Sequence, residues 1–149
     1  MPPIKYNARD IEFEVQDPDN PGTWLPILGV NTFTKSTDAE TAETTDFQSQ
    51  GQAQSEKMEL SKTLQLQGSR LKDPTTGAGD PGQVAVETLA DRLGPASLGG
   101  VRFAAPGDTT WEVWTAHVAM GDEGGGNNDK TSWEATFTRS GASTTAAKS

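Results

Sequence analysis

Residues 56–67, Glu-Lys-Met-Glu-Leu-Ser-Lys-Thr-Leu-Gln-Leu-Gln, decide the fold class of this chain. Large apolar side chains stand at even positions of the run (Met58, Leu60, Leu64 and Leu66), and every odd position is polar. A period of two is the signature of a strand with one face in a core and the other in water. The stretch therefore predicts an antiparallel sheet that has one entirely polar face.

Other segments carry strand signals and extend the prediction to a mainly β fold. They are residues 10–15, 23–34, 101–105, 110–120 and 131–139. The turn-forming run Asp17–Gly22 joins the first two and favours a hairpin. Pro26 and Gly29 indicate a bulge or an edge position in the second. We expect a β sandwich or barrel of about six to eight strands.

A helix is expected over residues 81–93, packed on the sheet. Asp80 stands at the N-cap position, Pro81 at the first helical position, and Gln83 where a capping box requires it. A single apolar stripe follows, made of Val86, Leu89, Ala90 and Leu93. A helix with one such stripe lies against a sheet.

Residues 35–55 are polar and rich in Thr, Ser, Glu and Gln, with Phe47 as the only large apolar side chain. A long loop inside a compact domain is usually functional or disordered. We expect either a surface loop or an arm that becomes ordered against a neighbouring subunit. Residues 1–141 are interpreted as a single domain that includes this loop. Residues 142–149 are interpreted as a flexible C-terminal tail.

The composition points to self-association. The 149 residues are only 32% hydrophobic, contain no Cys and carry a formal net charge of −9. A thin core gains stability when copies of a chain pack together. Without Cys, disulfides and thiolate metal sites are excluded. The acidic charge disfavours gripping DNA, and it indicates either a surface built for solubility or one that nucleic acid passes without binding. No apolar run has membrane length and no signal-peptide core is present, so we expect no conventional export signal.

The sequence holds no recognisable catalytic motif. His117 is the only histidine and lies in a strand pattern, so we interpret it as structural. The oxygen-rich runs Asp17–Gly22 and Gly121–Asp129 lack calcium-loop spacing and are interpreted as turns. Glu12 and Glu14 share a strand face but are treated as surface acids. We expect neither an enzyme nor a bound cofactor or metal.

Several features follow one another in a recognisable order. They are Trp24–Val30, the Thr/Glu-rich run Ser36–Asp46, the stretch Gly51–Leu66, and Gly126–Asp129 before Trp133–Phe137 and Ser140-Gly141. Over nearly the whole chain, this order resembles the major tail-tube family of siphophages. The resemblance implies a structural virion protein of the tail, made in the host cytoplasm. It also implies six-fold rings that stack into a conduit for DNA ejection, with the sheets joined into a continuous inner barrel.

The same resemblance implies the partners of the chain. The rings would surround a tape-measure protein, contact tail terminator and tail tip proteins, and let double-stranded DNA pass without specific binding; no membrane insertion is expected. Strand alternation then suggests, as a hypothesis, lumen-facing positions at Glu59, Glu12, Glu14, Glu134, Lys57, Gln65 and Gln67. The candidate arm between rings comprises Thr41, Glu43, Thr45, Asp46 and Phe47.

Two alternatives stay open. The same fold could be the inner tube of a contractile tail or injection system, which differs in having a sheath outside the tube. An immunoglobulin-like or carbohydrate-binding β sandwich would instead be a stable monomer with an exposed aromatic platform. Trp111, Trp114 and Trp133 lie in strand patterns that place them in the core, which disfavours such a platform.

Overall fold

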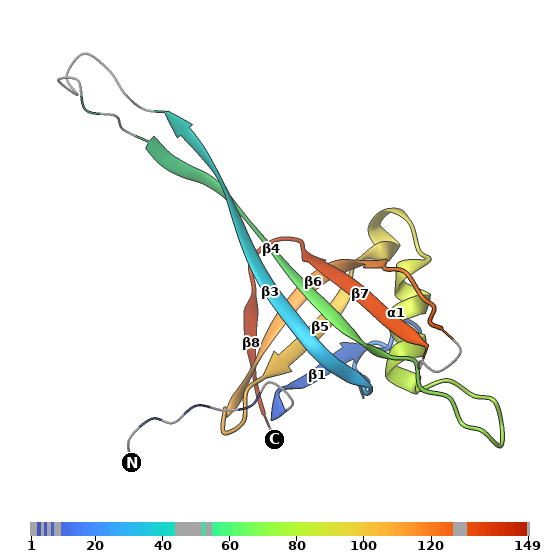
Figure 1. The fold of residues 1–149 in the computed structure, drawn as a ribbon. Coiled ribbons are helices and arrows are strands. Elements are labelled where there is room, and N and C mark those ends of the chain that lie inside the picture. Colours follow the sequence, from blue (N-terminus) through green and yellow to red (C-terminus); the bar gives the residue numbers. More distant parts are fainter. Residues whose placement is uncertain are drawn as a thin grey trace.

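The computed structural model describes residues 10–43, 55–126 and 131–148, together with positions 3, 5, 7 and 52. All strands in these ranges belong to one 8-stranded antiparallel sheet, which confirms the mainly β prediction (Figure 1). The strands are β1 Glu12–Gln16, β2 Trp24–Pro26, β3 Val30–Glu43, β4 Ser55–Ser69, β5 Gly99–Ala104, β6 Thr110–Met120, β7 Ser132–Arg139 and β8 Thr144–Ala147. Their order is β2-β1-β5-β6-β7-β4-β3, with β8 paired to β6.

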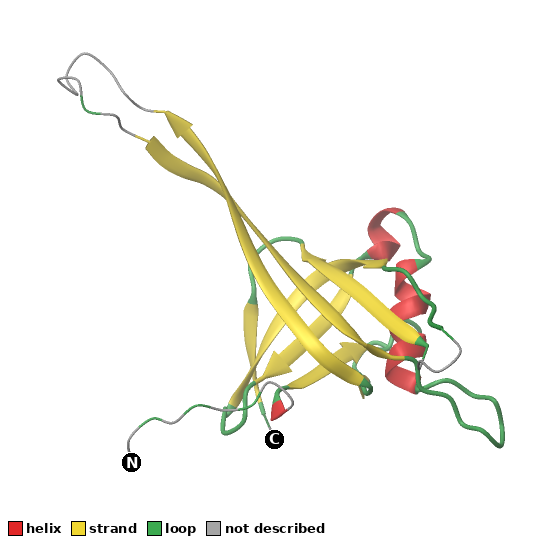
Figure 2. Cartoon of the chain, viewed as in Figure 1, coloured by secondary structure: helices red, strands yellow, loops and turns green. Residues whose placement is uncertain are grey.

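The sheet curls around its own core but does not close (Figure 2). Phe13 on β1 and Phe33 on β3 lie 5.5 Å apart between ring centroids, although their strands are not paired. The inner face of the sheet carries the buried side chains Val15, Leu64, Leu66, Val101, Phe103, Trp114, Val118, Trp133 and Phe137. The expected burial of Trp111, Trp114 and Trp133 is confirmed.

The helix α1 spans Pro81–Ala90 and lies at one end of the curved sheet (Figure 1). Asp80 is its N-cap, as expected, and its carboxylate accepts a hydrogen bond from the Gln83 N–H at 3.3 Å. Leu89 packs so closely on β5 that a Cβ at Gly99 would lie 2.7 Å from it. The helix ends before the predicted Leu93, because Leu93 has an extended backbone and an exposed side chain. No helix in the described ranges is long and apolar enough to cross a membrane.

The predicted strand over residues 23–34 is in fact two strands. β2 pairs with β1, which confirms the expected hairpin, whereas β3 starts at Val30 and pairs with β4. Gly29 lies between them with a φ of 83°, a conformation that only glycine adopts without strain. The chain therefore leaves one end of the sheet at Pro26 and joins the other end at Val30.

The predicted loop over residues 35–55 is wrong for Lys35–Glu43 and for Ser55. Residues 35–43 continue β3, and β4 starts at Ser55, so the two strands form one long hairpin with Glu43 opposite Ser55. Strands pair through backbone hydrogen bonds, which do not require apolar residues at alternate positions. The polar sequence of residues 35–43 therefore gave no strand signal. Thr41 and Glu43 lie in β3, while Thr45, Asp46 and Phe47 are outside the described residues.

A further strand lies in the segment expected to be a flexible tail. Residues Thr144–Ala147 form β8, which pairs with β6 through Thr110–Val113. Just after β8, the Lys148 ammonium lies 3.0 Å from the Glu12 carboxylate and 5.0 Å from the Trp111 ring centroid. The interpretation as a tail did not include this strand.

Candidate assembly surfaces

The outer face of β4 and β7 is polar, as predicted. Leu64 and Leu66 are buried on the inner face, and the residues between and beside them point outward. Across the strands, Gln65 faces Thr136 and Gln67 faces Glu134. The Gln65 amide also donates a hydrogen bond to the Glu134 carboxylate. The sheet therefore brings Gln65, Gln67 and Glu134 together on one hydrophilic wall.

Glu12 and Glu14 lie on a different part of the outer face. Arg102 on β5 is the cross-strand neighbour of Glu14, and its Nε donates to the Glu14 carboxylate at 2.8 Å. The Arg102 guanidinium is also stacked between two rings, 4.4 Å from the Trp24 centroid and 4.6 Å from the Trp111 centroid. With Lys148 beside Glu12, both glutamates have a cationic partner within the chain.

The outer part of the β3–β4 hairpin projects beyond the sheet (Figure 1). β7 pairs with β4 only from Thr63 onward, so Ser55–Lys62 has β3 as its sole strand partner in the described part of the chain. We call residues 37–43 and 55–62 the arm. Both faces of a two-stranded ribbon of this kind meet solvent, and hence both are available for contacts.

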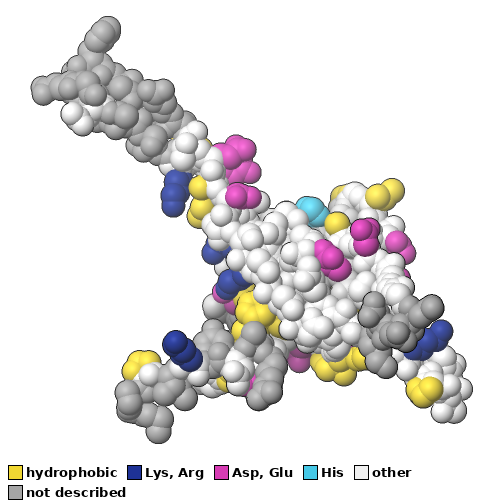
Figure 3. Space-filling view, in the orientation of Figure 1, with side chains coloured by type: hydrophobic (Ala, Val, Ile, Leu, Met, Phe, Trp, Pro, Cys, Tyr) yellow, Lys and Arg dark blue, Asp and Glu magenta, His cyan; other side chains and the backbone are white. Residues whose placement is uncertain are grey.

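One face of the arm is acidic. Glu40 on β3 lies directly opposite Glu59 on β4, and Asp38 lies opposite Ser61 on the same face. Figure 3 shows acidic side chains gathered on one side of the projecting hairpin. Like charges directly opposite each other in an antiparallel pair are destabilising. Glu40 and Glu59 therefore repel each other, and no cationic side chain lies opposite either of them in the described part of the arm.

The opposite face of the arm combines lysine and apolar side chains (Figure 3). Leu60 lies opposite Ala39, and Lys62 opposite Thr37. A register shift between Glu40 and Thr41 makes Lys57 the partner of Thr41, with Met58 as the additional residue. Lys57 therefore shares the face of Leu60. Strict alternation had placed it with Glu59 on the polar face, and the bulge corrects that prediction.

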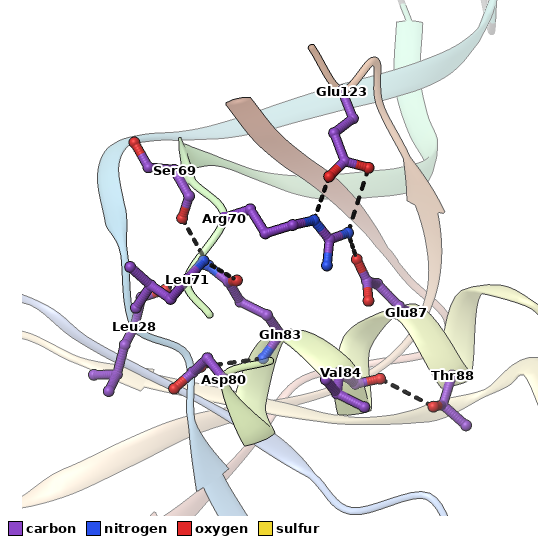
Figure 4. A network of polar contacts seen from close by, with 10 residues as sticks. All are labelled: Leu28, Ser69, Arg70, Leu71, Asp80, Gln83, Val84, Glu87, Thr88 and Glu123. Carbon is purple, nitrogen blue, oxygen red and sulfur yellow. Dashed lines mark hydrogen bonds and ion pairs between the residues drawn. The ribbon is translucent and has the colours of Figure 1, made fainter. Parts of the chain in front are cut away.

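The root of the hairpin is held by Gln83 on α1, which is fully buried. Its Oε1 accepts from the Leu71 N–H, and its Nε2 donates to the carbonyls of Leu28 and Ser69, each at 2.9 Å (Figure 4). The capping-box prediction is wrong for this residue, because the Asp80 N–H bonds to the Leu71 carbonyl instead. Local spacing alone suggested a cap, whereas the true partners lie on other segments.

Two further features make this root rigid. Arg70, just after β4, forms ion pairs with Glu87 on α1 and Glu123 after β6 (Figure 4). The backbones of Gly29 and Gly68 cross so closely that a Cβ at Gly68 would lie 2.0 Å from the Gly29 carbonyl oxygen. The arm is therefore anchored to the helix and to the body of the sheet at once.

The sheet has open edges in the described residues. β2 and β3 end the strand order, and β8 pairs with β6 alone. The edge of β3 runs from Val30 to Glu43. Unpaired strand edges of this length favour pairing with another chain unless something covers them. The edges and the arm therefore stay available for contacts with another chain.

The remaining polar candidates from the sequence are the two oxygen-rich runs and His117. Asp17 accepts hydrogen bonds from the Asp19 N–H and the Asn20 amide, and these bonds lower the pKa of its carboxyl group. The run Asp17–Gly22 is thus a turn. Residues 127–129 of the other oxygen-rich run are outside the described residues. No group of three or more His, Asp or Glu side chains in the described part could hold a metal ion. His117 is exposed on β6, opposite Thr138.

Solved structures share this fold. A chain from the tail of an empty GTA particle with C6 symmetry has a TM-score of 0.70 and 20% identity, over 96% of this chain and 100% of its own. A chain from the virion of a native gene transfer agent particle has a TM-score of 0.67 and 19% identity, over 96% of this chain and 100% of its own. A chain from the anti-feeding prophage baseplate has a TM-score of 0.59 and 11% identity, over 99% of this chain and 97% of its own. No protein-family model matches the sequence, and no curated protein matches it.

Proposed function

We propose that this chain is a tail-tube subunit of a virion. Copies assemble into six-fold rings, and the rings stack into a hollow conduit through which double-stranded DNA leaves the particle. The observation that carries the proposal is the shared fold, over 96% of this chain, with a chain of a C6-symmetric GTA tail. The role is structural rather than enzymatic.

The open sheet supports assembly through strand edges. A monomer leaves the edges of β2 and β3 unpaired, and joining sheets around a ring removes edges altogether. The low apolar content supports the same conclusion, because a thin core is tolerable when neighbouring copies complete the packing.

The polar outer face is our proposed lumen wall. It presents Gln65, Gln67 and Glu134 on the body of the sheet, and Glu59 continues the same face along the arm. A wall of amides and carboxylates repels the DNA backbone and gives it no cation to bind. Glu12 and Glu14 fit this role less well, because Lys148 and Arg102 already offset their charge. Lys57 lies on the opposite face of the arm.

The other partners follow from the same proposal. A tape-measure protein would fill the lumen during assembly, and tail terminator and tail tip proteins would bind the ends of the tube. The arm would reach an adjacent ring.

The inner tube of a contractile tail or injection system is the second candidate. The likeness to a chain of the anti-feeding prophage baseplate, with a TM-score of 0.59, supports a related setting for the same fold. A sheath protein distinguishes the two candidates. Co-purification of assembled tubes with such a protein from the native particle would favour the second.

Electron microscopy of the purified chain tests the proposal. Concentrated protein is expected to form rings or hollow tubes whose end views have six-fold symmetry. Sedimentation should show mass moving from monomer to a large species as concentration rises. A chain that stays monomeric at every concentration contradicts the proposal. In a reconstruction of the tube, Gln65, Gln67 and Glu134 should face the lumen, and their placement on the outer surface would reject the proposed wall.

A further inference from the structure

Two exposed apolar patches lie at opposite ends of the β3–β4 hairpin. The arm patch consists of Met58 and Leu60, with 67% and 49% of their surface exposed. The base patch consists of Leu28, Leu71 and Val84, with 51%, 36% and 43% exposed. Exposed apolar side chains that gather in patches mark surfaces for partners more often than single ones do.

The base patch is a coherent surface. The Gln83 amide bonds to the backbone of both Leu28 and Leu71, which holds the two residues next to each other (Figure 4). A Cβ at Gly79 would lie 3.0 Å from Val84 and 3.9 Å from the Leu71 carbonyl, so Val84 borders the same place. Beside the patch, residues 71–73 and 78–81 line a shallow, open hollow of about 370 Å³.

The two patches of one chain cannot meet. Leu60 and Gly68 are about 26 Å apart along β4 at roughly 3.3 Å per residue. Both positions belong to one continuous paired strand, and the root is fixed by Gln83 and by the crossing of Gly29 and Gly68. The arm patch therefore needs a surface on another molecule.

The charges around the patches are complementary. Lys57 and Lys62 flank Leu60, and their cross-strand neighbours Thr41 and Thr37 carry no charge. Asp73 and Asp80 border the base patch, together with Lys72. The Asp73 carboxylate accepts hydrogen bonds from the Thr75 and Thr76 N–H groups, which lower its pKa and keep it ionised. A basic apolar face thus matches an acidic apolar one.

We propose that the arm patch of one subunit docks on the base patch of a second copy of this chain. Leu60 would contact Leu28 and Leu71, and Lys57 and Lys62 would approach Asp73 and Asp80. The two patches differ from each other, so the contact is head-to-tail and repeats from copy to copy. This inference rests on the proposed function, and it identifies the receptor for the arm on the adjacent ring.

Cysteine cross-linking tests the contact directly, because the chain has no Cys of its own. Two single variants, Leu60→Cys and Leu28→Cys, are mixed, allowed to assemble and oxidised. A disulfide-linked heterodimer is expected on a non-reducing gel. The matched control replaces Leu60→Cys by Glu59→Cys, which lies next to it in sequence but on the opposite face of the arm. Docking predicts at least about tenfold less product from the control, since a disulfide requires the two Cβ atoms to approach closely.

Charge reversal gives a second readout. Lys62→Glu and Lys72→Glu make the same change in net charge, one on the arm face and one beside the base patch. Docking predicts opposite effects, because the first removes an attraction and the second removes a repulsion. The critical concentration for assembly, measured by pelleting, should rise about two- to fivefold for Lys62→Glu and fall for Lys72→Glu. The difference should shrink at high salt.

The outcomes separate this inference from the proposed function. If the wild-type chain assembles but the Leu60→Cys and Leu28→Cys pair gives no more product than the control, the docking is wrong and the tube function stands. Assembly with equal responses to the two charge reversals has the same meaning. If the wild-type chain never assembles, the proposed function fails and the docking fails with it.

Discussion

Gln83 on α1 donates a hydrogen bond from its Nε2 to the carbonyl oxygen of Ser69 at the end of β4, at 2.9 Å. The same amide bonds to the backbones of Leu28 and Leu71. One buried side chain thus joins the helix, the start of β3 and the end of β4. Because the arm is the continuation of β3 and β4, its direction depends on this junction.

Gln83→Leu should destabilise the fold. The change leaves the carbonyls of Leu28 and Ser69 and the Leu71 N–H without their partner, and an unsatisfied buried group costs about 1–3 kcal/mol. We expect the free energy of unfolding in urea to fall by about 2–4 kcal/mol. Gln67→Leu on the outer face is the control and should change it by less than about 0.5 kcal/mol. Equal effects of the two variants would contradict the assigned role of Gln83.

Gly68→Ala should also lower stability, for a steric reason. The new Cβ would lie 2.0 Å from the Gly29 carbonyl oxygen, so the two backbones must separate. Overpacking of this kind costs about 1–3 kcal/mol, which lowers the Tm of a chain of this size by roughly 3–10 °C. Gly124→Ala is the matched control, because nothing lies within 4 Å of its Cβ position. If Gly68→Ala has the same Tm as the control, the backbones of Gly29 and Gly68 are not in close contact.

Glu40→Lys should stabilise the arm. It replaces the repulsion between Glu40 and Glu59 by an attraction, and a cross-strand pair of opposite charge contributes about 0.2–1 kcal/mol. Amide hydrogen exchange in the arm, residues 37–43 of β3 and 55–62 of β4, should slow by about two- to fivefold. Glu40→Gln removes the repulsion without adding an attraction, so its exchange rates should be intermediate. Unchanged rates in both variants would mean that the two glutamates do not face each other.

Deletion of residues 142–149 should destabilise the chain. β8 pairs with β6 beside Trp111, and Lys148 lies over the Trp111 ring, so the deletion exposes a buried indole. We expect a loss of about 1–3 kcal/mol and a red shift of tryptophan fluorescence. A chain that ends at Lys148 keeps β8 and these contacts and should behave like the wild type. If the deletion leaves stability unchanged, residues 142–149 are a flexible tail after all.

The turn at Asp17 predicts a pH dependence on the acid side. Hydrogen bonds from Asp19 and Asn20 hold the pKa of Asp17 below its ordinary value of 3.8 in the folded chain. Its contribution to stability is therefore present above pH 3.8 and is lost as the pH falls through the lower, folded pKa. The carboxyl carbon of Asp17 in NMR should titrate below that of a model peptide. In Asp17→Asn, the free energy of unfolding should depend less on pH in this range.

Local periodicity in the sequence determined the class of the fold. Alternation at Thr63–Gln67 predicted a strand with a polar face, and Asp80 predicted the start of the helix. Both predictions hold because the causes are local, since side chains two apart on a strand share a face and a cap bonds within its own first turn. The acidic charge and the low apolar content were likewise available from composition.

Only the tertiary structure decided the surfaces proposed for assembly. Residues 35–43 carry no apolar alternation, yet they form β3 because β4 pairs with their backbone. Lys57 changes face because of a bulge, and β8 forms because β6 offers an edge. The Gln83 amide bonds to segments far along the chain. In each case the hydrogen-bonding partner is a backbone segment far along the chain. The local periodicity of the sequence cannot indicate such a partner.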